Sequence, residues 1–243
     1  MLKGTRITKS FGGLKALNSV DFEVREGEIV GLIGPNGSGK STLFNIISGL
    51  VRSDSGQVLF KGAPIQRLAP HRIASLGVGR TFQIVRPLMD LTLVHNVATA
   101  VLFGREHIKK PAEAKKRALG ILEFTGLSEK AHVLPGQLAL EDRKRLEIAR
   151  ALAIKPEIIL LDEVYAGLNQ KEIEEAIELT FRIRDEWGIT VFLIEHVMKA
   201  IMRTCSRVIA LHNGEKIADG DPESVANKAE VISAYLGAGY AER

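Results

Sequence analysis

Alternating apolar and polar residues mark the first part of the chain as strands. The alternation covers residues 2–11, 20–24 and 57–60, and turn signals around Gly12 and Gly62 follow two of these segments. Successive side chains of a strand point to opposite faces, so this pattern is typical of strands that bury one face. It therefore predicts a small antiparallel sheet.

A second pattern consists of short, continuously apolar segments. They cover residues 29–33, 158–161 and 190–194, and each leads into a helical or short amphipathic segment. Strands without a polar face are typical of parallel sheets that helices cover on both sides. This pattern predicts an α/β fold with a mostly parallel sheet and helices on both faces.

Two further segments complete the pattern. Residues 87–155 have a weak strand signal, and within them residues 111–124 carry helically spaced apolar positions among lysines. This part is expected to be a mostly helical insertion with an exposed amphipathic helix at 111–124. Near the other end, Asn213-Gly214 stands between two apolar runs and predicts a hairpin over 208–218.

Composition narrows the class of protein. The chain has 243 residues, of which 45% are hydrophobic, and a formal net charge of +4, which excludes a disordered or collagen-like chain. The basic excess is far weaker than in a dedicated DNA-binding domain, but charge alone decides little. No nucleic-acid partner is expected. Cys205 is the single cysteine, which excludes an intramolecular disulfide and indicates a core thiol.

Any membrane association is expected to be indirect. The first residues lack the apolar stretch of a secretory signal, and no window reaches the roughly 18 apolar residues that a spanning helix needs. The sequence therefore predicts a cytosolic protein whose membrane role comes through a partner.

One segment has the form of a phosphate-binding loop. It lies between the apolar strand at 29–33 and a helix expected at 42–48, and it fits the pattern G-x-x-x-x-G-K-[ST]. Backbone N–H groups of such a loop surround phosphates, Lys40 reaches the β- and γ-phosphates of ATP, and the Ser41 hydroxyl ligates Mg²⁺. The residues predicted to bind ATP here are Gly34, Pro35, Asn36, Gly37, Ser38, Gly39, Lys40, Ser41 and Thr42.

A pair of acids follows another apolar strand. Residues 158–161 lead directly into Asp162 and Glu163. Asp162 is predicted to hold Mg²⁺ through its coordination shell, and Glu163, one residue further, to polarise the attacking water. Together with the phosphate-binding loop, the pair predicts an ATPase in which Glu163 and Lys40 are catalytic residues.

These motifs, in this order, resemble the ATP-binding cassette (ABC) family, the ATPase subunits of membrane transporters, over essentially the whole chain. The resemblance implies that Phe11 stacks on the adenine of ATP. It implies that Gln83 joins the core to a helical subdomain and contacts ATP and Mg²⁺ or its water. It also implies that His196 is a catalytic switch histidine at the γ-phosphate.

The resemblance implies a domain organisation as well. Residues 1–243 would form one nucleotide-binding domain, with a P-loop NTPase core and an N-terminal antiparallel β subdomain at about 1–83 and 156–243, and a helical subdomain at about 84–155. The segment 84–93 is expected to be helical and to receive coupling helices of the membrane subunits. In an alternative that stays open, its apolar residues, such as Leu88 and Met89, belong to the core of the subdomain. The loop that crosses a dimer interface is assigned to Ala166, Gly167, Leu168 and Asn169, although many relatives have aspartate in place of Asn169.

One motif departs from the family pattern. The family's Leu-Ser-x-Gly-Gln/Glu signature would precede residues 145–152, and this chain instead has Leu138, Ala139, Leu140, Glu141 and Asp142. Two cassettes of this family face head to tail, so that each signature meets the γ-phosphate held by the other subunit. Ala139 offers no hydroxyl, and at about 5 Å and an effective dielectric of about 20, Glu141 would repel each phosphate charge by roughly 3 kcal/mol.

Two interpretations of these acids stay open. If Glu141 and Asp142 face the nucleotide, a homodimer would have two impaired sites and a heterodimer only one. This interpretation favours a heterodimer with a second, different ABC subunit. In the other interpretation, both acids cap a helix and point away from the nucleotide.

Four segments, at 31–37, 78–83, 146–152 and 166–169, together resemble the branched-chain amino-acid uptake subgroup. The resemblance implies an ATP-hydrolysing subunit on the cytoplasmic side of the inner membrane, which powers import of branched-chain or other amino acids through separate permease subunits. A solute-binding protein would act indirectly. Three alternatives stay open: a lipopolysaccharide-export cassette, whose end resembles residues 235–237 equally, a soluble ABC ATPase outside transport, and a nucleotide-binding regulator without turnover.

Overall fold

The computed structural model describes residues 1–83, 86–106 and 108–236, and the chain divides into two units. The first unit comprises Met1–Ile73 and Thr190–Arg243, and the second comprises Ala74–Ile189. Helix α2 (Pro70–Leu76) begins in the first unit and ends in the second. Each unit is described separately below.

An antiparallel sheet opens the first unit. Its strands β1 (Leu2–Phe11), β2 (Leu14–Val24), β4 (Ser55–Phe60) and β5 (Ala63–Pro64) lie in the order β2-β1-β4-β5. The antiparallel pairing confirms the prediction from the alternating pattern, and β2 begins earlier than the alternation suggested.

The second sheet of this unit is mostly parallel. Strand β3 (Ile29–Ile33) pairs in parallel with β8 (Thr190–Ile194) and with β9 (Arg207–His212), and β9 pairs antiparallel with β10 (Glu215–Gly220). Every residue of β3 and β8 is buried, as expected of strands without a polar face.

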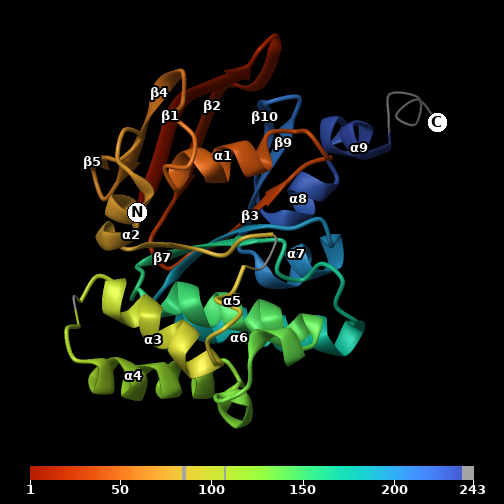
Figure 1. Cartoon of the computed structure of the whole chain (residues 1–243). Coiled ribbons are helices and arrows are strands. Elements are labelled where there is room, and N and C mark those ends of the chain that lie inside the picture. Colours follow the sequence, from red (N-terminus) through yellow and green to blue (C-terminus); the bar gives the residue numbers. More distant parts are fainter. Residues whose placement is uncertain (84–85, 107, 237–243) are drawn as a thin grey trace. The chain divides into compact units, whose positions relative to one another are not determined.

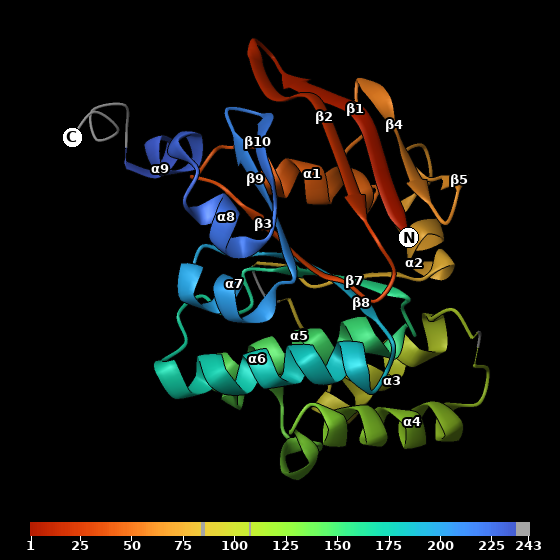
Figure 2. The same ribbon diagram turned by 180° about the vertical axis from the view of Figure 1, so that it is seen from behind.

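Helices cover β3 and β8 on both faces (Figures 1 and 2). Phe192 of β8 meets the ring of Phe44 on α1 (Lys40–Ile47), with ring centroids 5.1 Å apart. On the opposite face, a Cβ on Gly31 would lie 2.9 Å from Sγ of Cys205, directly after α7 (Met198–Thr204). Cys205 is buried and burial raises the pKa of its thiol to about 12, so the expected core thiol is confirmed.

The hairpin predicted over 208–218 is confirmed by the pairing of β9 with β10. Asn213 and Gly214 connect β9 to β10 with φ angles of 48° and 78°, the left-handed conformation that a two-residue hairpin requires. Two short helices follow, α8 (Pro222–Ala226) and α9 (Ala229–Leu236).

The second unit is rich in helices. Strand β6 (Val78–Arg80) pairs in parallel with β7 (Ile158–Asp162), and α3 (Leu93–Phe103) packs against α4 (Pro111–Phe124) and α5 (Leu140–Ala153). Helix α4 has the predicted bounds and buries the predicted apolar positions. The remaining elements are η1 (Ser128–Lys130), η2 (Pro135–Gln137) and α6 (Gln170–Asp185).

The helix expected at 84–93 is wrong for the residues that the structure describes. Residues 86–92 form an irregular loop with a turn at 89–90, and α3 begins only at Leu93, while residues 84 and 85 lie outside the described ranges. The side chain of buried Asn96 stabilises this loop, since its amide bonds the backbone N–H and C=O of Leu88 at 2.8 and 2.9 Å and the carbonyl of Leu91 at 2.8 Å. The side-chain amide of Asn96, in α3, thus satisfies backbone groups of residues 88 and 91 that a helix would otherwise pair.

The two units do not follow the predicted subdomain boundaries. Strands β6 and β7 fall in the unit with the helices, whereas the sequence reasoning placed them in the core at 1–83 and 156–243. The subdomain assignment itself stays a prediction.

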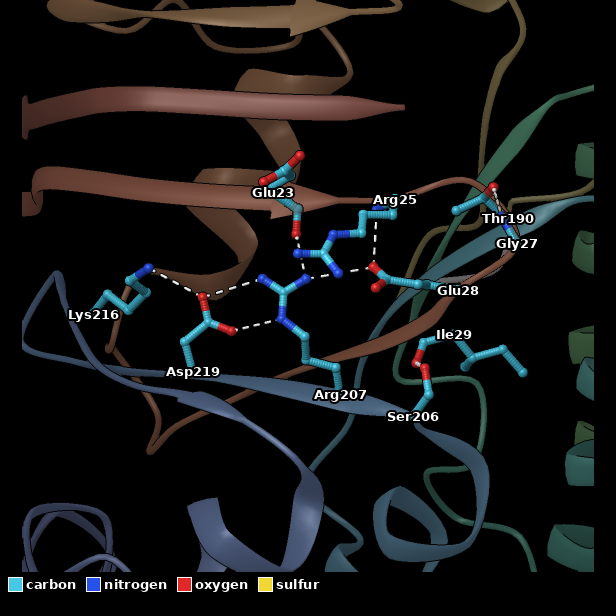
Figure 3. A network of polar contacts seen from close by, with 10 residues as sticks. All are labelled: Glu23, Arg25, Gly27, Glu28, Ile29, Thr190, Ser206, Arg207, Lys216 and Asp219. Carbon is cyan, nitrogen blue, oxygen red and sulfur yellow. Dashed lines mark hydrogen bonds and ion pairs between the residues drawn. The ribbon is translucent and has the colours of Figure 1, made fainter.

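Arg207 connects several segments of the first unit (Figure 3). Its Nε and Nη2 donate to the two carboxylate oxygens of Asp219 at 2.7 and 3.2 Å, and its Nη1 donates to the carbonyl of Glu23 at 3.1 Å and to the carboxylate of Glu28 at 3.4 Å. Lys216 adds a bond to Asp219 at 3.1 Å. Burial alone would raise the pKa of Asp219, but the hydrogen bonds from Arg207 and Lys216 outweigh it and the pKa is lowered.

Replacing Arg207 by methionine is expected to lower the free energy of unfolding by about 1–3 kcal/mol at pH 7, because Asp219 loses two charge-assisted hydrogen bonds. A carboxyl whose pKa is lowered by folding stabilises the protein above its unfolded pKa of about 3.9, and this contribution is lost as the pH falls through the folded pKa. The difference between wild type and Arg207→Met should therefore shrink below about pH 4 in urea titrations. Arg184→Met, which breaks the more exposed ion pair with Asp185, is the control and should lose less than about 1 kcal/mol. Equal losses in the two variants would contradict the role of Arg207.

Candidate nucleotide-binding and catalytic site

The predicted phosphate-binding loop connects β3 to α1 in the first unit. It needs glycine at two positions, because a Cβ on Gly34 would lie 2.1 Å from the carbonyl oxygen of Leu211, and a Cβ on Gly39 would lie 2.5 Å from that of Ala16. Gly39, with φ 104°, directly precedes α1, which begins at Lys40 rather than at residue 42. Asn36, Gly37 and Ser41 are exposed, whereas Gly34, Ser38, Gly39 and Lys40 are buried and Pro35 and Thr42 are half-buried.

The ammonium group of Lys40 lies inside this loop. Its Nζ donates to the carbonyl of Gly34 at 2.7 Å and to that of Pro35 at 3.0 Å. The hairpin turn supports the far side of the loop, where the N–H of Gly214 donates to the carbonyl of Ser38 at 3.1 Å. A buried cation beside the N-terminus of α1 gives the loop the positive potential that binds phosphate.

Phe11 and His196 also belong to the first unit. Phe11 ends β1 and is 50% exposed, with Nζ of Lys9 at 5.3 Å from its ring centroid. His196 is exposed two residues after the end of β8. An exposed aromatic ring and an exposed imidazole can each contact a bound ligand.

Asp162 ends β7 in the second unit and is held by Arg80, the last residue of β6, and by Thr81, which follows it. Its carboxylate forms an ion pair with Arg80 of β6 at 3.0 Å, and its N–H donates to Oγ1 of Thr81 at 3.0 Å. Both charged side chains are buried. Burial lowers the pKa of the Arg80 guanidinium, and the adjacent Asp162 carboxylate opposes that change.

Glu163 has the most informative geometry of the predicted residues. Its φ of 52° lies in the left-handed region, which a side chain of this size rarely adopts and which is frequent at functional sites. Nε2 of Gln83 donates to its carboxylate at 2.9 Å, and Nζ of Lys144 donates to its backbone carbonyl at 2.7 Å. The structure thus brings together Gln83 and Glu163, two predicted residues that are 80 positions apart.

The loop at 166–169 connects β7 to α6. Gly167 has a φ of 77°, and the side chain of Asn169 accepts a bond from the N–H of Glu172 at 3.1 Å, while the Glu172 carboxylate accepts from the N–H of Asn169 at 2.8 Å. This reciprocal pair is a capping box at the start of α6. The departure at Asn169 is therefore compatible with an ordered loop.

The altered signature opens α5, with Ala139 in the position that precedes the first helical residue. Glu141 forms an ion pair with Arg145 one turn later, and Arg145 also contacts Glu175 of α6 at 2.5 Å. Asp142 is buried and forms an ion pair with Lys130. Each acid therefore has a cationic partner within its own unit, which reduces the negative charge that it presents to a phosphate, and both interpretations stay open.

Sequence reasoning missed several supporting residues. Arg80 and Lys144 contact the predicted acids from β6 and α5. Tyr235 belongs to the segment 235–237 noted above, but its hydrogen bond with Gly34 of the loop was not predicted. Each is a polar residue whose partner lies on another element, so no local pattern could have found it. For Arg80, the sequence offered one indication: it lies three residues before the predicted site residue Gln83.

Comparisons with known proteins identify the family of this chain. Residues 17–166 match the family described as ABC transporter. The branched-chain amino acid transport ATP-binding protein LivG of Salmonella typhimurium is 42% identical over 93% of this chain and 94% of its own, and BraF of Pseudomonas aeruginosa is 40% identical over 98% of each. The solved ATP-binding cassette MJ1267 superposes with a TM-score of 0.89 at 31% identity, over 98% of this chain and 99% of that one.

The chain therefore belongs to the ABC transporter family, and the predicted P-loop NTPase fold is confirmed. As an ATPase of this family it binds and hydrolyses ATP and works with membrane permease components. A related cassette of 32% identity, MJ0796, has a dimeric structure. Within residues 1–83, 86–106 and 108–236, no helix has both the length and the apolar character to cross a membrane.

Proposed function

We propose that this chain is the ATP-hydrolysing subunit of an importer for branched-chain or other amino acids. The identity of 40–42% to transport ATP-binding proteins named for branched-chain amino acids, over 93–98% of the chain, carries the substrate class. The same relatives favour this reading over a lipopolysaccharide-export cassette, a soluble ABC ATPase and a regulator without turnover.

In this proposal the first unit binds the nucleotide. Phe11 stacks on adenine, backbone N–H groups of residues 34–42 surround the phosphates, and His196 contacts the γ-phosphate. Lys40 exchanges its bonds with the Gly34 and Pro35 carbonyls for the β- and γ-phosphate oxygens. An ammonium group that is already buried within the loop supports this role, because it needs no long-range rearrangement to reach a phosphate.

The second unit supplies the residues for hydrolysis. Glu163, oriented by Gln83, positions and polarises the attacking water. Mg²⁺ arrives with the substrate ATP, and the Ser41 hydroxyl, the Asp162 carboxylate and the Gln83 amide oxygen are its proposed ligands. These are the hard oxygen donors that Mg²⁺ prefers, which makes the residues chemically suitable.

The proposed partners are a second, different ABC subunit, transmembrane permease subunits and, indirectly, a solute-binding protein. The chain would lie on the cytoplasmic face of the cell membrane as a peripheral subunit. The loop at 86–92 presents the exposed side chains of Leu88 and Met89, which suit an apolar contact with a permease.

Uptake of labelled leucine tests this function. In a strain that lacks the native gene, the wild-type chain should restore ATP-dependent uptake, and Lys40→Ala should restore less than about a tenth of it, because the phosphate charge loses its cation. Lys116→Ala, the same change on the exposed face of α4, is the matched control and should behave as wild type. If the purified chain hydrolyses ATP but leucine uptake is unaffected by its absence, the substrate class is wrong and the ATPase assignment stands.

A further inference from the structure

The last described helix reaches the phosphate-binding loop. The hydroxyl oxygen of Tyr235, on α9, accepts a hydrogen bond from the backbone N–H of Gly34 at 2.8 Å, although the two residues are 201 positions apart. The tyrosine is 39% exposed, and burial raises the pKa of its hydroxyl, so the group stays neutral at physiological pH. The contact lies within the first unit.

Gly34 lies directly after β3, and its N–H donates to Tyr235 instead of to a neighbouring strand. The last paired residue of β3 on the β9 side is Ile33, which lies opposite Ala210. One residue further, the tyrosine hydroxyl replaces the strand carbonyl as the acceptor. The space around Gly34 is closed as well, since a Cβ there would lie 2.1 Å from the Leu211 carbonyl oxygen and 2.6 Å from Oγ of Ser38.

The carbonyl of the same residue holds the catalytic lysine. Nζ of Lys40 donates to the Gly34 oxygen at 2.7 Å, while the Gly34 N–H donates to Tyr235. The tyrosine hydroxyl therefore holds Gly34 in place, and the Gly34 carbonyl in turn positions the ammonium group of Lys40. A shift of Gly34 would move both the beginning of the loop and the position from which Lys40 reaches phosphate.

We propose that Tyr235 is a positioning residue for the phosphate-binding loop, so that the affinity for ATP depends on the docking of α9. The proposal rests on the proposed role of residues 34–42. Buried Val231 anchors α9 in the first unit, and α9 packs against β9 and β10, the two strands that carry the hairpin turn beneath the loop. Any contact that displaces α9 would then weaken nucleotide binding without touching the site.

The experiment separates the hydroxyl from the ring. Tyr235→Phe removes only the hydroxyl, and Tyr235→Ala removes the packing of the ring as well. Calorimetry at low temperature measures the binding of MgATP to the purified full chain. NMR on ¹⁵N-glycine-labelled protein measures hydrogen exchange of the Gly34 amide, and thermal unfolding checks that each variant is folded. Tyr165→Phe, which removes a tyrosine hydroxyl bonded to Thr180 in the second unit, is the control for the exchange measurement.

We expect Tyr235→Phe to raise the Kd for MgATP, and the KM of hydrolysis, about three- to tenfold, as the loss of one neutral hydrogen bond implies, with kcat changed less than twofold and an unchanged melting temperature. The Gly34 amide should exchange at least about threefold faster than in wild type or in Tyr165→Phe. If Tyr235→Phe matches wild type in Kd and exchange while Tyr235→Ala is impaired, only the ring acts and the proposal is overturned. Failure of the wild type itself to bind MgATP would instead reject the phosphate-binding loop.

Discussion

Replacing Glu163 by glutamine is expected to lower the kcat of ATP hydrolysis by about 10²- to 10⁴-fold, the usual contribution of a positioned general base. The affinity for MgATP should change less than about threefold. Glutamine has the shape of glutamate, its amide oxygen can still accept the bond from Gln83, and the bond from Lys144 goes to the backbone carbonyl. The left-handed backbone at this residue is therefore retained while the basic carboxylate is lost. Phosphate release and calorimetric binding on the same preparation measure both quantities.

Glu129→Gln is the matched control for this variant, because it makes the same chemical change at an exposed position of η1 in the same unit. It should leave kcat and affinity as in wild type. Retention of more than about a tenth of the wild-type kcat by Glu163→Gln would show that another group activates the water.

The double variant Ala139→Ser/Glu141→Gly is expected to raise hydrolysis by the isolated chain at least about tenfold. Serine supplies the hydroxyl that Ala139 lacks, and glycine removes a carboxylate that would repel a phosphate charge by roughly 3 kcal/mol at about 5 Å. The ion pair between Glu141 and Arg145 reduces this repulsion, so the gain should stay below the roughly 150-fold that 3 kcal/mol would give. Arg145 keeps Glu175 as a partner after the change.

Gel filtration of variants that also carry Glu163→Gln measures ATP-dependent dimerisation. This measurement tests the effect of residues 139 and 141 on nucleotide-dependent closure without hydrolysis. The two single variants separate the hydroxyl from the charge, and thermal unfolding accounts for the helix stabilisation that a serine at this position brings. A wild type that already hydrolyses ATP as fast as the double variant, in a Glu163-dependent way, would mean that Glu141 only caps α5 and that the chain needs no different partner.

The sequence predicted those elements whose side-chain pattern is local. The alternation at residues 2–11, the apolar strands at 29–33 and 190–194 and the amphipathic helix at 111–124 all have the predicted bounds, because burial of one face or of both faces determines the pattern directly. The loop at 86–92 could not be predicted in this way, since its conformation depends on hydrogen bonds to Asn96 in the following helix.

The candidate site likewise contains residues that a local pattern predicted and residues that it did not. The glycines, Lys40 and Ser41, and the acids Asp162 and Glu163 were predicted because phosphate and Mg²⁺ require particular residue types at short, fixed spacing after a strand. The residues that hold these groups in place were not predicted in that role: Arg80 contacts Asp162, Lys144 contacts Glu163, and Tyr235 contacts Gly34. Gln83 was predicted as a site residue, but its bond to Glu163 was not. The pairing of the Glu141 carboxylate with Arg145 likewise came from the structure alone.

The sequence by itself therefore predicted the family, the strands and helices whose pattern is local, and the candidate reactive groups. Only the tertiary structure decided which polar partner each of these groups has. The physical reason is the sequence distance over which each signal acts. Periodicity and motif spacing involve residues a few positions apart. The hydrogen bond from Gly34 to Tyr235 joins positions 201 apart and exists only because both segments pack in the same unit.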